Sequence, residues 1–200
     1  LPKSPSIDDI EAYAMRRHRL RGQFVELGTA VGFCVLMKRE VIAKTGVWDE
    51  RFSPGYFDDA EYSMRASRSG FKSVCAKGAF VYHREHSSFK HKKLEDIFRR
   101  NRKIYYSMYG EPRRILYIVD KFNDRFYRFI ERRVLESARQ ANWVWVFVKS
   151  SLPYLRSPEH GNIKQLKIPD FFFIFRCIYR ILMRQKKKFD LIYVNNGRIL

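Results

Sequence analysis

Short apolar runs alternate with short helical segments over the first half of the sequence. Residues that favour strands are frequent in the runs at 24–27, 31–37, 71–76 and 79–83. The segments 38–45 and 58–69 have helical composition, and each is closed by a glycine, Gly46 and Gly70, in the position where helices commonly end. Apolar runs of this length are typical of strands buried on both faces. The alternation therefore predicts an α/β sandwich.

Two further helices are predicted on either side of this alternation. Ser6 and Asp9 have the spacing of a capping box, and the helical spacing that follows predicts a helix over 8–19. A longer amphipathic pattern covers 91–109 and stops before Pro112. We therefore place the end of the first domain near residue 112.

The sequence becomes basic and aromatic after this point. We expect 113–187 to be a mainly helical extension or linker, with a proline-containing loop at 153–170 and an apolar helix at 171–183. Its helices either pack on the first domain or rest on anionic lipid. The predicted helix is too short to span the ~30 Å hydrocarbon core of a bilayer. The residues 188–200 read as the first strand and turn of a possible second α/β domain, similar to segments of GT-B-type enzymes.

The net charge of +19 is unevenly distributed. Residues 1–110 carry 21 basic and 13 acidic side chains, and residues 111–200 carry 19 and 8. A positive field of this size attracts phosphate groups in nucleotides, lipid headgroups or nucleic acid, and does not distinguish among them. The three cysteines, Cys34, Cys75 and Cys177, lie far apart. They indicate neither a disulfide framework nor a zinc site, and fit a reducing cytoplasmic environment.

A cluster of carboxylates begins the predicted helix at 58–69. Asp58, Asp59 and Glu61 lie within its first turn, and Arg65 follows on nearly the same face as Asp58. Negative charge near a helix N-terminus is stabilising by about 0.3–1 kcal/mol, so an isolated cluster of this kind needs no explanation beyond the helix dipole. Its neighbours in the sequence give it a second interpretation.

Six elements around this cluster occur in a fixed order. The first is a strand that begins at Gly32 and is followed by a turn with Arg39, and the second is a loop from Gly46 through Trp48, Asp49 and Glu50 to Phe52. The third is the helix start at Phe57, Asp58 and Asp59, with Arg65 downstream. The last three are Gly70 to Val74, a strand that ends in His83, and Ser87 to Phe89. The series resembles inverting glycosyltransferases of family 2, which have the GT-A fold. The resemblance covers about residues 24–110 and implies the acceptor-binding, catalytic half of such a domain.

The resemblance implies that Asp59 is the catalytic base. Three positions depart from the family pattern. Trp48 replaces the usual Phe, Asp58 replaces the usual Glu, and Ala60 occupies a position where an acidic residue is common. The first two changes are conservative, and the third leaves Asp59 aligned with the base of the family. A base is needed because the acceptor hydroxyl loses its proton as it attacks the anomeric carbon.

The same resemblance implies a set of substrate-binding residues: Gly32, Trp48, Phe57, Asp58, Glu61 and Arg65. Each has an ordinary alternative. Trp48 and Phe57 either stack on a sugar ring or belong to the core. Arg65 either pairs with an acid or reaches a phosphate.

Members of the family hold Mn²⁺ or Mg²⁺ with an Asp-x-Asp motif, often joined by a histidine at the position of His83. A divalent cation neutralises charge on the leaving diphosphate. His83 is thus a candidate metal ligand, with a surface histidine as the alternative. The sequence contains no Asp-x-Asp. We expect this motif and the nucleotide-binding strands upstream of Leu1, in a longer protein, so that the present chain is not competent alone.

The implied function is transfer of a sugar, with inversion, from a nucleotide-sugar donor to a glycan or lipid-linked acceptor during cell-envelope polysaccharide or glycan synthesis. We expect a cytoplasmic location, with an anionic membrane surface as a further candidate partner. Two alternatives remain: a basic nucleic-acid-binding module and a non-catalytic interaction domain with a GT-A-like fold. Nucleic acid is not the expected partner, because no recognised binding signature is present.

Overall fold

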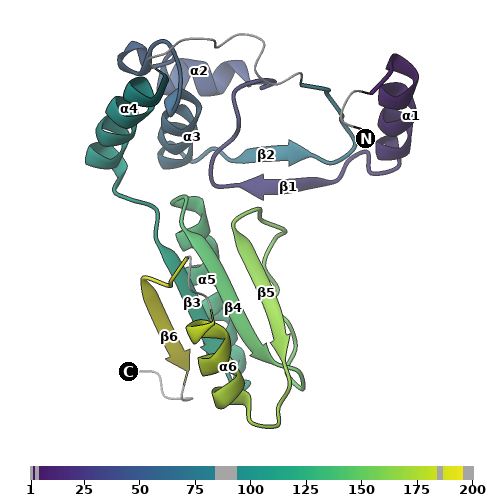
Figure 1. Ribbon diagram of the computed structural model, residues 1–200, viewed down its shortest axis with the longest axis vertical. Coiled ribbons are helices and arrows are strands. Elements are labelled where there is room, and N and C mark those ends of the chain that lie inside the picture. Colours follow the sequence, from purple (N-terminus) through teal and green to yellow (C-terminus); the bar gives the residue numbers. More distant parts are fainter. Residues whose placement is uncertain (1, 3–4, 84–93, 184–186, 196–200) are drawn as a thin grey trace. The chain divides into compact units, whose positions relative to one another are not determined.

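The chain divides into two compact units, residues 1–110 and 111–200. The computed structural model describes residues 2, 5–83, 94–183 and 187–195 (Figure 1). The start of the helix expected at 91–109 and the expected motif at Ser87 to Phe89 lie outside these residues. Among the described residues, no helix is long and apolar enough to cross a membrane.

The helices of the first unit begin and end close to their predicted positions. They are α1 (Ile7–His18), α2 (Arg39–Thr45), α3 (Asp58–Arg68) and α4 (Leu94–Tyr109). The short 3-10 helix η1 (Glu50–Phe52) lies in the segment that was expected to be a loop. The capping box of α1 is formed: Asp9 N–H donates to Ser6 Oγ at 3.1 Å, and Ser6 N–H donates to Asp9 Oδ2 at 3.0 Å. Gly46 ends α2 at a φ of 78°, which favours glycine.

The strands of the first unit are fewer than predicted. β1 (Phe24–Leu27) pairs antiparallel with β2 (Ser73–Ala76) in a two-stranded sheet. The apolar runs 31–37 and 79–83, expected to be strands, are irregular. A strand requires a hydrogen-bonding partner, and no described strand lies beside either run. Their apolar side chains are correspondingly exposed, as for Leu36, which is fully accessible.

The second unit is a four-stranded parallel sheet with a helix on each face. The strands are β3 (Arg114–Val119), β4 (Trp143–Lys149), β5 (Ile163–Ile168) and β6 (Leu191–Asn195), in the order β5-β4-β3-β6. The helices are α5 (Asp124–Arg139) and α6 (Phe173–Leu182). Strands β4 and β5 are added in sequence on one side of β3, whereas β6 pairs on its other side, as in doubly wound α/β folds. Together with the first unit, this sheet confirms the predicted mixed α/β class.

Alternate residues of the central strands form two hydrophobic cores. Ile115, Tyr117 and Val119 pack with the inner face of α5, whereas Leu116 and Ile118 pack with Phe173 and Cys177 of α6. Strands buried on both faces account for the continuous apolar sequences of β3 and β4.

The second unit corrects the expectation of a mainly helical extension. Three of its strands lie within 113–187, and the strand predicted after residue 188 pairs with β3 in the same sheet. The loop expected at 153–170 contains β5, an edge strand whose sequence is less apolar than those of β3 and β4. The prolines that suggested a loop, Pro153, Pro158 and Pro169, all lie outside the strand. The apolar helix predicted at 171–183 is confirmed as α6.

Candidate active site

Helix α3 begins in an unusual backbone conformation. Tyr56 and Phe57 both have positive φ, 67° and 66°, and Phe57 occupies the N-cap position without a capping side chain. Non-glycine residues in this region cost on the order of 1 kcal/mol each, and they persist only where the surroundings hold them. The first turn that follows carries Asp58, Asp59 and Glu61. Because successive helical side chains differ by about 100° in direction, the three carboxylates have different surroundings.

Asp59 is half-buried and fixed by two backbone donors. Its Oδ2 accepts a hydrogen bond from Gly32 N–H at 3.0 Å, and its Oδ1 accepts one from Ala60 N–H at 2.7 Å. One turn later on α3, Ser63 Oγ accepts from Ala30 N–H at 2.9 Å. Asp59 and Ser63, spaced by four residues on α3, therefore hold two amides, of Gly32 and Ala30, in the irregular segment that follows β1.

Glycine at position 32 permits this close approach. A Cβ atom at position 32 would lie 3.3 Å from the Cβ of Asp59 and 3.7 Å from the Trp48 ring. The Trp48 ring stacks on Tyr62 of α3, with centroids 5.0 Å apart and planes 22° apart. The structure thus brings together Gly32, Trp48 and Asp59, three of the residues proposed from the sequence.

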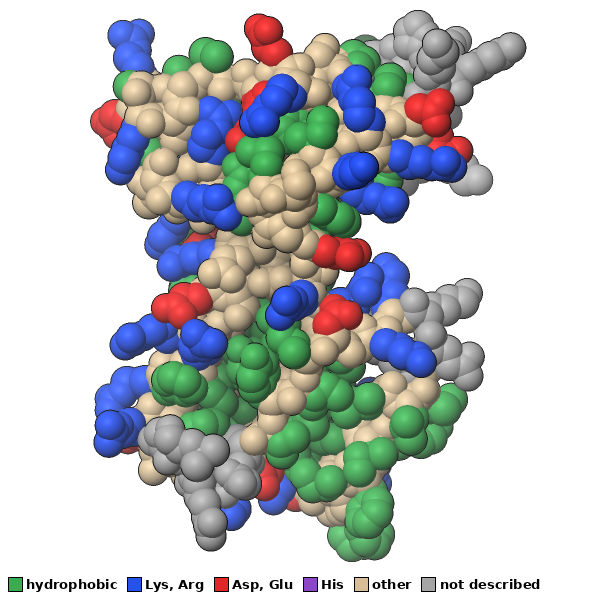
Figure 2. Space-filling view, turned by 90° about the vertical axis from the view of Figure 1, so that its left-hand side faces the viewer, with side chains coloured by type: hydrophobic (Ala, Val, Ile, Leu, Met, Phe, Trp, Pro, Cys, Tyr) green, Lys and Arg blue, Asp and Glu red, His purple; other side chains and the backbone are tan. Residues whose placement is uncertain are grey.

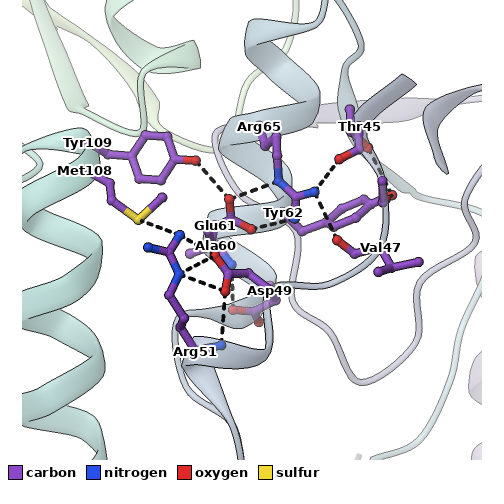
Figure 3. Close-up of polar contacts among 12 residues, drawn as sticks. Thr45, Val47, Asp49, Arg51, Ala60, Glu61, Tyr62, Arg65, Met108 and Tyr109 are labelled. Carbon is purple, nitrogen blue, oxygen red and sulfur yellow. Dashed lines mark hydrogen bonds and ion pairs between the residues drawn. The ribbon is translucent and has the colours of Figure 1, made fainter. Parts of the chain in front are cut away.

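Glu61 and Arg65 lie in a network inside the unit (Figure 3). Glu61 is 2% exposed, and its carboxylate accepts bonds from Arg65 Nε at 3.0 Å, Arg65 Nη2 at 2.7 Å and the Tyr109 hydroxyl at 3.0 Å. Arg65 also donates to the carbonyls of Thr45 and Val47, the latter at 3.0 Å. The expected pairing of Arg65 with an acid is confirmed, and it ties α3 to the end of α2.

The charges of this network shift the pKa values of its members. The hydrogen bonds that Arg65 donates to Glu61 raise the pKa of the Arg65 guanidinium. Burial, reinforced by the Glu61 carboxylate, raises the pKa of the Tyr109 phenol to about 12. Both groups therefore keep their protons at neutral pH, and the network retains its donors.

A second ion pair caps η1 beside this network (Figure 3). Asp49 accepts from Arg51 N–H at 3.0 Å and forms an ion pair with the Arg51 guanidinium at 2.5 Å. The bonds from Arg51 hold the pKa of the Asp49 carboxyl below its usual value. Asp49 thus fixes the loop that leads from Trp48 towards α3.

Asn101 on α4 holds the strained start of α3. It is fully buried, and its Nδ2 donates to the carbonyls of Phe52 and Gly55, both at 2.8 Å, and of Tyr56 at 3.1 Å. The Phe57 ring packs against the rings of Phe98 and Tyr105 of α4, each with centroids 5.3 Å away. Sequence reasoning missed Asn101, although an amide on the apolar side of an amphipathic helix was a visible signal.

His83 is exposed, and its ring lies 4.7 Å from that of Phe33, centroid to centroid. No three His, Cys, Asp or Glu side chains gather into a metal-binding group within the described residues. His83 offers one nitrogen ligand, which is insufficient for a site by itself. The other histidines of this region, His86 and His91, lie outside the described residues.

The carboxylate of Asp59 is held in a fixed orientation beside the exposed residues 31–33. Each Asp59 oxygen accepts one backbone hydrogen bond and retains acceptor capacity for a further donor. Gly32 and the neighbouring Val31 and Phe33 are exposed, so a molecule can approach the carboxylate from this side. A group placed in this way can accept a proton from a hydroxyl within hydrogen-bonding reach.

Comparison with known proteins assigns a family to the first unit. The model of glycosyltransferase-like family 2 matches residues 9–107, which include most of α1, all of α2 and α3, most of α4 and the carboxylates described above. No curated protein and no solved structure matches the chain.

Proposed function

Because residues 9–107 belong to glycosyltransferase-like family 2, we propose that the first unit carries the catalytic base of an inverting sugar transfer. The donor is a nucleotide sugar and the acceptor is a hydroxyl group of a glycan or a lipid-linked saccharide. The observation that carries the proposal is Asp59, a carboxylate oriented by Gly32 N–H and Ala60 N–H at the start of α3.

Asp59 accepts the proton of the acceptor hydroxyl as its oxygen attacks the anomeric carbon. The bond from this carbon to the diphosphate oxygen breaks on the opposite face, and the bonding electrons leave with the nucleoside diphosphate. General base catalysis of this kind contributes about 10²- to 10⁴-fold to the rate. Fixing the carboxylate beforehand reduces the reorganisation that the transition state requires.

The remaining residues divide into two groups by their contacts. Gly32 lies against Asp59 and Trp48, and Asp58 precedes Asp59 in the first turn of α3; these three residues are our candidates for contact with the acceptor. Glu61, Arg65 and Phe57 are engaged by α4 or by the end of α2, and we assign them to positioning α3. Of the six substrate-binding residues proposed from the sequence, three thus remain candidates for contact with the acceptor, and three are assigned to positioning α3.

Family members commonly use a divalent cation, and Mn²⁺ or Mg²⁺ remains part of the proposal. Of the described residues, His83 is our candidate for a single ligand, and further ligands would have to come from elsewhere. The described side chains do not fit a complete metal site. We therefore derive no step through the metal.

The setting of the reaction follows from the same family assignment. We propose a hexosyl transfer in cell-envelope polysaccharide or glycan synthesis, on the cytoplasmic side of the membrane. The basic character of both units is compatible with a diphosphate donor and with an anionic membrane surface.

The stereochemistry of the product tests the proposal. The intact protein is first offered a panel of nucleotide sugars, and release of nucleoside diphosphate that requires an acceptor identifies the donor. The anomeric configuration of the glycoside is then determined by NMR. We expect the configuration opposite to that of the donor, because the attack is a single displacement. Retention would exclude Asp59 as the base of a direct displacement.

A further inference from the structure

Helix α6 carries two apolar faces. Phe173 and Cys177 point into the core of the second unit, with Ile181 packed beside them. Phe175, Ile178, Tyr179 and Leu182 form a second stripe at helical spacing on the opposite side of the helix. A helix on the outside of an α/β unit normally presents a polar face to water.

This outer stripe is exposed and wide. The exposed fractions are 70% for Phe175, 47% for Ile178, 64% for Tyr179 and 72% for Leu182. Phe171 and Phe172, which precede the helix, are 71% and 60% exposed and extend the stripe. Hydrophobic side chains gather on the second unit in Figure 2. With ~200 Å² per phenylalanine, the three phenylalanines alone expose on the order of 400 Å², comparable with the largest patch on a typical monomer.

Basic side chains border the stripe along α6, and two acidic residues, Asp170 and Asp190, stand just beyond its ends in the sequence. Arg176 and Arg180 each follow a stripe residue by one position, so they lie along one border of the stripe. Residues 171–189 contain six basic residues and no acidic residue in the sequence. An apolar stripe bordered by cations is the pattern of a helix that lies in the interface of an anionic bilayer.

We infer that α6 with Phe171 and Phe172 docks the second unit on an anionic lipid surface. The aromatic and aliphatic side chains enter the boundary between headgroups and acyl chains, while Arg176 and Arg180 contact lipid phosphates. The ten residues of α6 extend about 15 Å, so the helix lies along the surface and does not cross it. A second copy of the chain is a poorer partner, because it would bring the same cations against one another.

This inference names the surface for the membrane contact included in the proposed function, but it does not depend on sugar transfer. Binding of the intact protein to vesicles needs no donor or acceptor. Loss of vesicle binding would therefore leave the catalytic proposal standing, and loss of transfer would leave the docking surface standing.

Vesicle co-sedimentation tests the inference. We expect the intact protein to bind vesicles of mixed phosphatidylglycerol and phosphatidylcholine, to bind pure phosphatidylcholine vesicles much less, and to be released by salt. Each cation near the surface contributes about fivefold to partitioning. Equal binding to both vesicle types, or no binding at low salt, would overturn the inference.

A matched pair of substitutions locates the surface. Phe175→Gln on α6 should lower partitioning roughly tenfold or more, because one large apolar side chain no longer enters the bilayer. Phe129 on α5 is 57% exposed, and Phe129→Gln should leave partitioning unchanged. Urea unfolding should be the same for both variants, because both positions are on the surface. Equal binding by Phe175→Gln and the unsubstituted protein would overturn the assignment to α6.

A charge variant separates lipid from a protein partner. Arg176→Glu combined with Arg180→Glu should weaken binding to the anionic vesicles by more than tenfold. The oligomeric state is measured in parallel by light scattering. A dimer that becomes monomeric on Phe175→Gln, without vesicle binding by either form, would replace lipid by a second copy as the occupant.

Discussion

At the residue scale, the first turn of α3 gives adjacent carboxylates different tasks. Asp59 keeps acceptor capacity and faces an exposed segment, whereas Glu61 is buried and satisfied by Arg65 and Tyr109. Burying a charged pair is costly, and removing one partner leaves an unbalanced charge inside the protein. The Glu61 pair is therefore expected to matter for stability more than a pair at the surface.

Two Glu–Arg pairs with the same i,i+4 spacing test this difference. Glu61→Gln should destabilise the protein by about 2–4 kcal/mol, because Arg65 loses its buried partner. Glu95→Gln should change stability by less than ~1 kcal/mol, because Glu95 and Arg99 are 75% and 63% exposed. Urea unfolding of both variants measures the two values. Similar losses would contradict the structural role assigned to Glu61.

Single-residue roles were predictable only in part. Arg65 was expected to pair with an acid or to reach a phosphate, because it lies on nearly the same face of the helix as Asp58. Its partner in the structure is Glu61, one turn away. The bond between Asp59 and Gly32 joins residues 27 positions apart, and the sequence contained no local signal for it. Gly32 entered the proposed site through family resemblance, and its physical reason, the 3.3 Å approach to Asp59, required the fold.

At the scale of elements, α4 holds the loop from which α3 begins. Asn101 binds three carbonyls between Phe52 and Tyr56, and this compensates for the positive φ angles at Tyr56 and Phe57. The geometry of the proposed base therefore depends on a helix that starts 35 residues after Asp59.

Replacing Asn101 should loosen the start of α3. Asn101→Ala leaves the carbonyls of Phe52, Gly55 and Tyr56 without their buried donor, and we expect a loss of about 2–3 kcal/mol. Amide hydrogen exchange should accelerate in the first turn of α3. Ser107→Ala is the control on the same helix, since Ser107 Oγ donates to the Ile104 carbonyl within α4 itself. Unchanged exchange in Asn101→Ala would contradict the role of this contact.

Helices were predictable because their signals are local. The signals that predict a helix lie within it or within a few residues of its ends. Here they are the N-cap Ser6, the helix-ending glycines Gly46 and Gly70, and amphipathic spacing. Strands depend on partners elsewhere, so the runs 31–37 and 79–83 had the right composition without forming strands. β5 was missed for the converse reason, since its pairing with β4 compensates for a weak pattern.

At the scale of the whole molecule, the chain joins two α/β units with different features. The first contains the carboxylate site and matches glycosyltransferase-like family 2. The second contains a parallel sheet and the apolar outer stripe of α6. Both carry excess positive charge, which favours phosphate-bearing partners at each unit.

The central claim is that Asp59 is the catalytic base, and substitution in the intact protein tests it most directly. Asp59→Asn keeps an oxygen to accept from Gly32 N–H but cannot take up a proton at neutral pH. The matched control is Asp8→Asn, the same change in the first turn of α1. We expect kcat to fall about 10²- to 10⁴-fold in Asp59→Asn, with donor binding unchanged and stability lowered by only about 1 kcal/mol, because the amide nitrogen cannot accept from Ala60 N–H. We expect kcat to stay unchanged in Asp8→Asn. Equal turnover by Asp59→Asn and the unsubstituted protein would contradict the assignment.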